Sequence, residues 1–376
     1  MSRFRVVFSS VRAAIGVGAV VAFSGCGDRT GPVVGHAFGV SRGGHSIVEL
    51  VRAVYDSQPT GARLGVLTWD VPGGANLMQE TEGANFFAAN RNVIAVVGHN
   101  GSRNALIASM VYSDAHVAHL VPNATSRRLT TAGDWTFQLV PDDSAEGAYL
   151  ASYAYDSLRA HRIAVLYVGD EYGTGLRDGV RSELAARGTD PPVDVTMVPN
   201  ESCYSAQARS IQRLIVVAAL RRGQPDVVVA ATGMSNARCL ADIIEAERPG
   251  TPILGADGFG FQTAPNAPVN PAVLQQVRFV RFWQPGADSV NRVFLDRWHR
   301  VSERPPNDVD ALTYDGYMLL DAAVRAVGPS RLAVRTWLRS LGVTRAPFQG
   351  VTGPISFARG RVGLVLRMVP AQESAP

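Results

Sequence analysis

The sequence predicts an α/β protein with two parallel sheets that are flanked by helices. Short apolar runs alternate with amphipathic stretches along nearly the whole chain, a pattern typical of strands joined by crossover helices. The clearest unit is Val93–Thr125, which has the pattern of a strand, a polar loop, a helix and a second strand. With 376 residues, the chain is long enough for two domains of ordinary size.

Each strand expected in the first two thirds of the chain is an apolar run bounded by turn signals. These strands are Pro32–His36, Ala62–Thr68, Val93–Val97, Val117–Val121, Ile163–Val168, Val193–Val198, Asp226–Ala231 and Pro252–Gly255. The segments between them carry apolar residues at helical spacing. The expected helices are Ser46–Tyr55, Asn76–Asn90, the segment after Ser102, Ala145–Leu158, Leu176–Ala186, Ala206–Leu220 and Asn236–Glu247.

The pattern changes near Arg278, where a strand with arginine on one face is followed by three helices in succession. These helices are Ser289–Arg300, Val309–Val327 and Leu332–Leu341. The last two expected strands are Gly353–Phe357 and Val362–Val369. We expect them to pair as a hairpin through the turn at 358–361.

Ser102 stands just before the helix of the Val93–Thr125 unit. Leu106, Ile107, Met110 and Val111 recur after it at helical spacing, so we expect Ser102 to be the N-cap and the apolar residues to face the core. The free N–H groups of the first turn would then point at the preceding loop, and a helix N-terminus attracts anions.

Ser102 and Thr125 follow two neighbouring strands of the same predicted unit. The loops after parallel strands emerge at the carboxyl edge of a sheet, where open α/β sheets bind ligands. We therefore expect the two side chains to face one carboxylate together. The alternative is that Ser102 only caps its helix and Thr125 only fills a turn.

The N-terminus has the three parts of a secretory signal. Arg3, Arg5 and Arg12 precede the apolar run Ala13–Phe23, and two small residues then lead to Cys26. This ending resembles the lipobox of bacterial lipoproteins, in which the cysteine is lipidated and becomes the first mature residue. A plain secreted protein or an uncleaved anchor is the alternative.

The charge of the mature chain argues against nucleic acid as a partner. Removing residues 1–25 removes three arginines and no acidic residue, so the formal net charge of +4 falls to +1. The basic residues are all arginine. A nearly neutral chain lacks the basic surface that binds phosphates.

The remaining cysteines are Cys203 and Cys239, an even pair in an oxidising compartment, which favours a disulfide between them. Two separate thiols are the alternative. His116 and His119 could suggest a metal pair, but a separation of three residues in a strand places them on opposite faces, and we expect no metal. The segment Gly173–Gly179 matches a dinucleotide-binding loop only weakly, and the sequence contains no nucleophile elbow. We therefore expect a protein that is not an enzyme and needs no cofactor.

Several segments together resemble the type I periplasmic solute-binding proteins, in particular the leucine/isoleucine/valine-binding branch that serves ABC importers. They are AVVGHNGS, LVPNATSRRLT, LYVGDEYGTGL, LGADGFG, TYDGYMLLDAAVRA and FQGVTGPISF. The resemblance covers most of the mature chain, and it implies a Venus-flytrap fold of two doubly wound parallel-sheet lobes joined by three crossovers. The crossovers would fall near Val140–Asp143, Arg278–Trp283 and Gly350–Pro354. The implied division is a lipoprotein signal peptide at 1–25, lobe 1 at 26–141 and 284–350, and lobe 2 at 142–283 and 351–376.

The resemblance also implies a ligand site. Ser102 and Thr125 match the positions that hold a ligand α-carboxylate. The main-chain carbonyl of Asn123 and the side chain of Asp257 match those that hold the α-ammonium, and Tyr172 matches an aromatic residue of the second lobe. Gly233 and the short loop His36–Gly39 stand where the family places side-chain contacts. The resemblance therefore implies recognition of the α-carboxylate and α-ammonium groups of an amino acid more strongly than it implies selection of a leucine, isoleucine or valine side chain.

The implied function is capture of a small amino acid or analogue and its delivery to an ABC permease. The protein would be a monomer in the periplasm or cell envelope, tethered to the membrane by lipidated Cys26. The alternative is a ligand-sensing surface lipoprotein of the same fold without a transport role.

Overall fold

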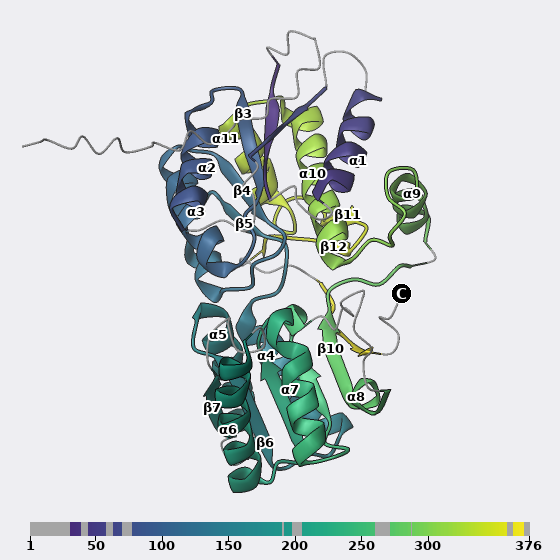
Figure 1. Ribbon diagram of the computed structural model, residues 1–376. Coiled ribbons are helices and arrows are strands. Elements are labelled where there is room, and N and C mark those ends of the chain that lie inside the picture. Colours follow the sequence, from purple (N-terminus) through teal and green to yellow (C-terminus); the bar gives the residue numbers. More distant parts are fainter. Residues whose placement is uncertain are drawn as a thin grey trace, which may run out of the picture. The chain divides into compact units, whose positions relative to one another are not determined.

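The computed structural model describes residues 31–38, 44–57, 63–69, 77–189, 192–197, 205–259, 271–286, 288–358 and 364–371. The expected signal peptide and Cys26 lie outside the described residues, as does Cys203. The described chain forms two mainly parallel sheets with helices packed against them (Figure 1). The predicted α/β class with two sheets is confirmed.

The first sheet is parallel and has the strand order β2-β1-β3-β4-β5. Its strands are β1 (Val33–Ala37), β2 (Gly65–Thr68), β3 (Val93–Gly98), β4 (Ala118–Val121) and β5 (Thr136–Gln138). β3 and β4 are buried along their whole length, as expected for central strands that are covered on both faces.

Helices from two distant parts of the chain cover this sheet. They are α1 (Gly44–Asp56), α2 (Leu77–Ala89) and α3 (Ser102–Asp114), and then α9 (Ser289–Trp298), α10 (Asp308–Val327) and α11 (Arg331–Ser340). In Figure 1, α2 and α3 lie on one side of the sheet, and α1 and α10 lie on the other. The three late helices therefore return to the sheet formed by the first strands, as the sequence resemblance implies.

The second sheet has the order β13-β10-β9-β8-β6-β7, and all its pairings are parallel except that of the edge strand β13. Its strands are β6 (Ile163–Val168), β7 (Val193–Met197), β8 (Val227–Ala231), β9 (Ile253–Gly255), β10 (Val277–Arg281) and β13 (Arg367–Pro370). Its helices are α4 (Asp143–Ser152), which continues into a π-helical turn at Tyr153–Ser157, α5 (Glu171–Ala186), α6 (Ala206–Gly223), α7 (Met234–Glu247) and α8 (Pro271–Gln276).

Aspartates of α10 hold the segment that leaves β10 and the turn that follows residue 350. Asp308 accepts hydrogen bonds from the backbone N–H of Phe282 at 2.7 Å and from the Arg281 side chain at 2.8 Å. Asp315, two turns further on, accepts bonds from the backbone N–H groups of Val351 at 2.7 Å and Thr352 at 2.9 Å. These buried and part-buried bonds fix the chain where it leaves β10 and where it turns after residue 350.

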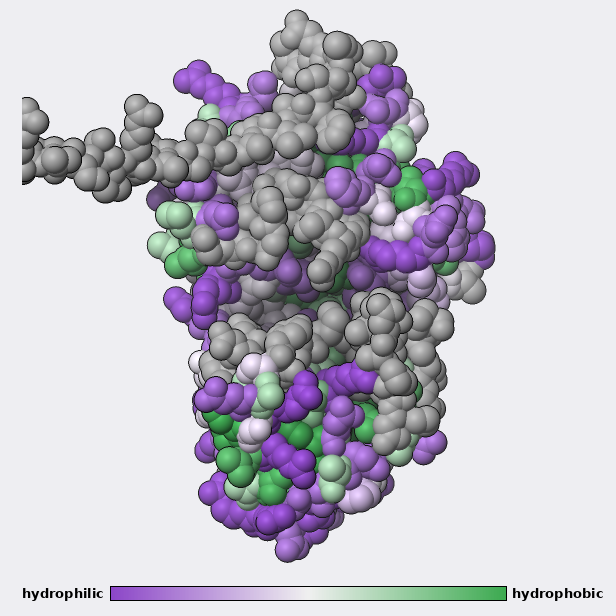
Figure 2. Space-filling model, in the orientation of Figure 1, coloured by the Kyte–Doolittle hydropathy of each residue, from purple (hydrophilic) through white to green (hydrophobic). Residues whose placement is uncertain are grey.

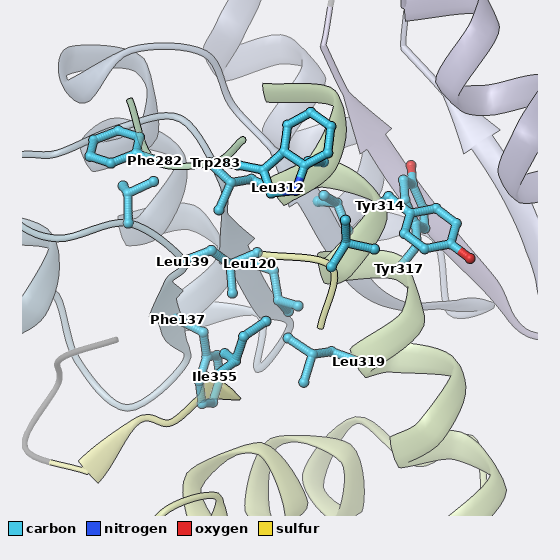
Figure 3. Close-up of a cluster of buried hydrophobic side chains, with 14 of the residues drawn as sticks. Leu120, Phe137, Leu139, Phe282, Trp283, Leu312, Tyr314, Tyr317, Leu319 and Ile355 are labelled. Carbon is cyan, nitrogen blue, oxygen red and sulfur yellow. The ribbon is translucent and has the colours of Figure 1, made fainter. Parts of the chain in front are cut away.

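The same segments pack into an apolar cluster beside the first sheet. Figure 3 shows that Phe282 and Trp283, which follow β10, lie in one cluster with Phe137, Leu312 and Ile355. The ring centroids of Phe137 and Phe357 are 5.0 Å apart. Apolar burial therefore complements the aspartate contacts in holding these connections.

The expected closing hairpin is wrong. β12 (Gly353–Ile355) pairs with β11 (Phe348–Gly350), while β13 pairs with β10 in the second sheet. Ile355 and Phe357 are buried beside the first sheet. Together with the pairing of β12 with β11, this burial associates residues 351–357 with the first sheet. The division of the chain into lobes remains a proposal, and this pairing favours a final boundary beyond Phe357.

The face of the molecule seen in Figure 2 is largely polar where it is described. Figure 2 shows hydrophilic residues over much of the described part of one face, with hydrophobic residues in scattered patches. Among the described residues, no helix combines the length and apolar character needed to cross a bilayer.

Candidate functional site

The loop before α3 and the turn after β4 lie side by side at the carboxyl edge of the first sheet. The N–H of Gly101 donates to the carbonyl of Asn123 at 3.1 Å. The N–H of Ser126 donates to the hydroxyl oxygen of Ser102 at 3.2 Å, and the Asn123 amide donates to Asn100. We call Asn100–Ser102 and Asn123–Ser126 the polar turns.

Ser102 does not cap α3, contrary to expectation. The N-cap is Gly101, which makes no side-chain cap bond, and Ser102 is the first helical residue. The Ser102 hydroxyl accepts a bond from Ser126, and its own hydrogen can still be donated to a ligand. The expected apolar face of the helix is confirmed only in part: Leu106 and Val111 pack against buried clusters, whereas Met110 is 70% exposed and the small residues Ala105 and Ala108 are fully buried.

Asp257 and Tyr172 meet at the carboxyl edge of the second sheet, where β6, β8 and β9 are adjacent. Asp257 follows β9, and Tyr172 lies in the first turn of α5. The Tyr172 hydroxyl donates to the Asp257 carboxylate at 2.7 Å and accepts from the N–H of Gly258 at 3.0 Å. The Tyr172 hydroxyl thus orients Asp257.

Two further carboxyl groups lie beside Asp257, and sequence analysis missed both. Asp143 and Glu146 are in the first turn of α4 and are 1% and 0% exposed. One Glu146 oxygen accepts from the N–H of Asp257 at 2.6 Å. We call Asp143, Glu146 and Asp257 the acidic cluster.

Close packing of α4 against α5 buries these acids. A Cβ placed on Gly147 would lie 2.3 Å from the carbonyl oxygen of Leu176, and one on Gly179 would lie 2.7 Å from that of Ser144. A Cβ on Gly175 would lie 2.8 Å from Asp143. Glycine at these positions lets the two backbones approach, so the first turn of α4 packs against α5 at Gly175 and Gly179.

Burial is the main cause of perturbed pKa values in this cluster. It raises the pKa of Asp143 to about 8, partly offset by the Thr125 hydroxyl, and nearby Asp257 adds to the rise. Burial and then the charge of Asp257 raise the pKa of Glu146 well above its usual value. Burial also raises the pKa of Asp257, against the effect of the Tyr172 hydroxyl. Buried carboxyl groups resist ionisation unless a cation joins them.

The polar turns contact the elements that carry the acids. The carbonyl of Thr125 accepts from the N–H of Asp143 at 2.7 Å, and Thr125 is only 2% exposed. The hydroxyl of Ser126 donates to Glu171, which begins α5, at 3.0 Å. Ser102, Thr125, Asp143, Glu146, Asp257 and Tyr172 thus form one connected set.

The remaining predicted residues have other surroundings. A Cβ placed on Gly233, which follows β8, would meet no atom within 4 Å, so the chain leaves open space where the family places a side-chain contact. Cys239 in α7 is disulfide-bonded, and its expected partner Cys203 lies outside the described residues.

The alternatives to a binding site find no support in the described residues. The buried His119 side chain bonds to Ser109 and to the carbonyl of Gly98, and no group of three His, Cys, Asp or Glu residues among those described is suited to hold a metal. Gly173–Gly179 lies inside α5 and is not a dinucleotide-binding loop.

A hydroxyl-rich helix start beside buried carboxyl groups can hold a small molecule by its negative and positive ends. Such a site at the edges of two α/β sheets, between which the chain passes more than once, is that of a solute-binding protein. Residues 74–371 match the family of periplasmic binding proteins. The chain belongs to this family, and the predicted resemblance to its leucine/isoleucine/valine-binding branch is confirmed. Its location is accordingly periplasmic or otherwise extracytoplasmic.

A curated relative, Leu/Ile/Val-binding protein homolog 1 from Brucella abortus, is 32% identical over 124 residues, which are 33% of each chain. The chain thus spans about a third of the length of such relatives. A leucine-binding protein from Thermotoga maritima shares the fold at 19% identity, with a TM-score of 0.75 over 90% of this chain and 94% of that chain. A benzoate-bound solute-binding protein from R. palustris has 17% identity and a TM-score of 0.73 over 91% and 93%. These are binding proteins, and the chain is not an enzyme.

Proposed function

We propose that this protein captures a small amino-acid-like solute between its two lobes and delivers it to an ABC permease. The polar turns would hold the ligand carboxylate, with the Ser102 hydroxyl and the first N–H groups of α3 as donors. The Thr125 hydroxyl would also donate to the ligand carboxylate, and the main-chain carbonyl of Asn123 would accept from the ligand ammonium. Asp257, oriented by Tyr172, would hold the ammonium.

The acidic cluster carries this proposal. The fold alone does not choose the ligand, because a leucine-binding protein and a benzoate-bound protein both share it. Benzoate is only an anion, and burying it beside three carboxyl groups would be unfavourable. A zwitterion supplies the cation that buried carboxyl groups require.

A thermal-shift screen tests the ligand class. Amino acids, small amides and aromatic acids are added singly to the purified mature protein, and the unfolding temperature is measured. We expect stabilisation by at least one amino acid and none by aromatic acids, since a ligand that binds only the native state raises the unfolding temperature. Stabilisation by aromatic acids alone would contradict the proposal.

We also propose that Cys26 is lipidated and tethers the protein to the membrane as a monomer. Mass spectrometry of the mature N-terminal peptide should show a lipid-modified Cys26, and C26S should move the protein from the membrane fraction to the soluble fraction. An unmodified Cys26 would rule out the tether. Ligand uptake that is lost when the protein is deleted would favour transport over the sensing role.

A further inference from the structure

The acidic cluster has no cation to balance it. In the described part of the chain, Asp143, Glu146 and Asp257 form no ion pair with any arginine or histidine. Both oxygens of Asp143 and one of Glu146 are buried without a hydrogen bond of ordinary geometry among the described residues, and the nearby Thr125 hydroxyl only partly offsets the effect of burial on Asp143. A buried acceptor without a donor is costly, so these oxygens must hold protons or receive a ligand.

Glu146 and Asp257 lie close enough to share a proton. One Glu146 oxygen already accepts from the Asp257 N–H at 2.6 Å, and the charge of Asp257 acts on Glu146. Two buried carboxylates this close repel each other, so the pair is more stable when one of them carries a proton. The empty cluster is therefore partly protonated at neutral pH, in agreement with the raised pKa values of Asp143 and Glu146.

The surroundings add negative charge and do not supply a compensating cation. The titratable groups with the largest effects on the cluster from outside it include Asp142, Glu171, Asp308 and Tyr172, and none of these is a cation. Arg281 is paired with Asp308, and Arg128 lies 3.5 Å from Glu171. A cation that balances the charge of the acidic cluster must therefore come from outside the described residues.

We propose that the acidic cluster is a receptor for one ammonium group and that capture of this group releases a proton to solvent. This inference rests on the proposed function and extends it to Asp143 and Glu146. The ammonium keeps all its hydrogens and donates them to the carboxylates, while the proton that the empty cluster held leaves as H⁺. No covalent bond changes. The ligand class is therefore a primary amine with a carboxylate at hydrogen-bonding distance from the polar turns.

Calorimetry with the mature protein tests the proton release. The probe is the amino acid that stabilises the protein most in a screen of the twenty standard amino acids, titrated at pH 7 in two buffers with different ionisation enthalpies. We expect release of about one proton per ligand, and a Kd that falls up to about tenfold per pH unit between pH 6 and 8. D143N/E146Q should release almost none and have a nearly constant Kd. D178N, which removes an exposed carboxylate of α5, should behave as the wild type.

Infrared spectroscopy of the ligand-free protein provides a second readout. At pH 7 the wild type and D178N should show a protonated-carboxyl band that is weaker in D143N and in E146Q, and these single variants serve if the double variant does not fold. Absence of that difference, or amino-acid binding without proton release, would overturn the proton-linked receptor while leaving the proposed function in place. Failure of every amino acid to bind would overturn both.

Discussion

The Tyr172 hydroxyl donates a hydrogen bond to Asp257 at 2.7 Å, and this contact joins the first turn of α5 to the turn after β9. The same oxygen accepts the N–H of Gly258 at 3.0 Å. A Cβ on Gly258 would lie 2.8 Å from it, so glycine is needed for the approach. One phenol therefore fixes both the backbone and the carboxylate at the second sheet's edge.

Y172F should weaken ligand binding by about 1–2 kcal/mol, because Asp257 loses its donor and the N–H of Gly258 loses its acceptor. Calorimetric titration with the best amino acid measures the change. Y155F is the matched control, because Tyr155 lies in the π-helical turn and its ring contacts His161 and Arg187. Equal losses in both variants would contradict a positioning role for Tyr172.

S102A should weaken binding by about 1–2 kcal/mol through the loss of a hydrogen bond to the ligand carboxylate. The S113A variant removes a hydroxyl near the other end of α3 and should bind normally. Because Ser102 also accepts the N–H of Ser126, the unfolding temperature of both variants is measured alongside affinity. A variant S102A that is destabilised yet binds with full affinity would restrict Ser102 to a structural role.

Asp143 makes stability depend on pH in a defined direction. Its pKa is about 8 in the folded protein and 3.8 in an unperturbed carboxyl group, so the native state keeps a proton that the unfolded state has lost. The free energy of unfolding should therefore fall as pH rises from about 4 to about 8, by up to about 1.4 kcal/mol per pH unit from this group. D143N should lose this contribution and be more stable than the wild type at pH 8 in urea unfolding. An unchanged pH slope would contradict the assignment.

D315N should destabilise the protein by about 1–3 kcal/mol, because asparagine keeps only one acceptor oxygen, so the N–H of either Val351 or Thr352 loses its acceptor. Asp315 is 1% exposed and also accepts the Thr352 hydroxyl at 2.7 Å. Urea unfolding at pH 7 measures the loss. D296N is the control, because Asp296 is exposed on the neighbouring helix α9. Similar stability of the two variants would show that Asp315 does not hold the connection after β11.

Strands were the most predictable elements of this fold. β6 coincides with the predicted run Ile163–Val168, and β8 differs from Asp226–Ala231 by one residue. Central parallel strands are apolar on both faces and end at turn residues, so local sequence defines them. The start of α5 was missed by five residues, because its glycines suggested a loop. Gly173 instead permits close packing, since a Cβ there would lie 2.1 Å from the carbonyl oxygen of Val168.

Strand partners near the C-terminus and the burial of the acidic cluster depend on tertiary contacts, so local sequence could not predict them. The pairing of β12 with β11 and of β13 with β10 joins segments whose partners no local pattern specifies. The site was anticipated at Ser102, Thr125 and Asp257, whose predicted roles in binding remain predictions. Asp143 and Glu146 could be recognised only as acids at a helix start, a common arrangement. Their burial depends on the packing of α4 against α5, which the sequence does not reveal locally.

A comparison of an amino acid with the same molecule lacking its amino group tests whether the acidic cluster binds the ligand ammonium. The amino acid that stabilises the protein most in the screen and its deaminated acid are titrated into the mature protein at pH 7 by calorimetry. If the polar turns hold the carboxylate while the acidic cluster holds the ammonium, the deaminated acid should bind at least about 100-fold more weakly, because the cluster is left without its cation. Equal affinity for the two molecules would show that the acidic cluster does not hold the ligand ammonium.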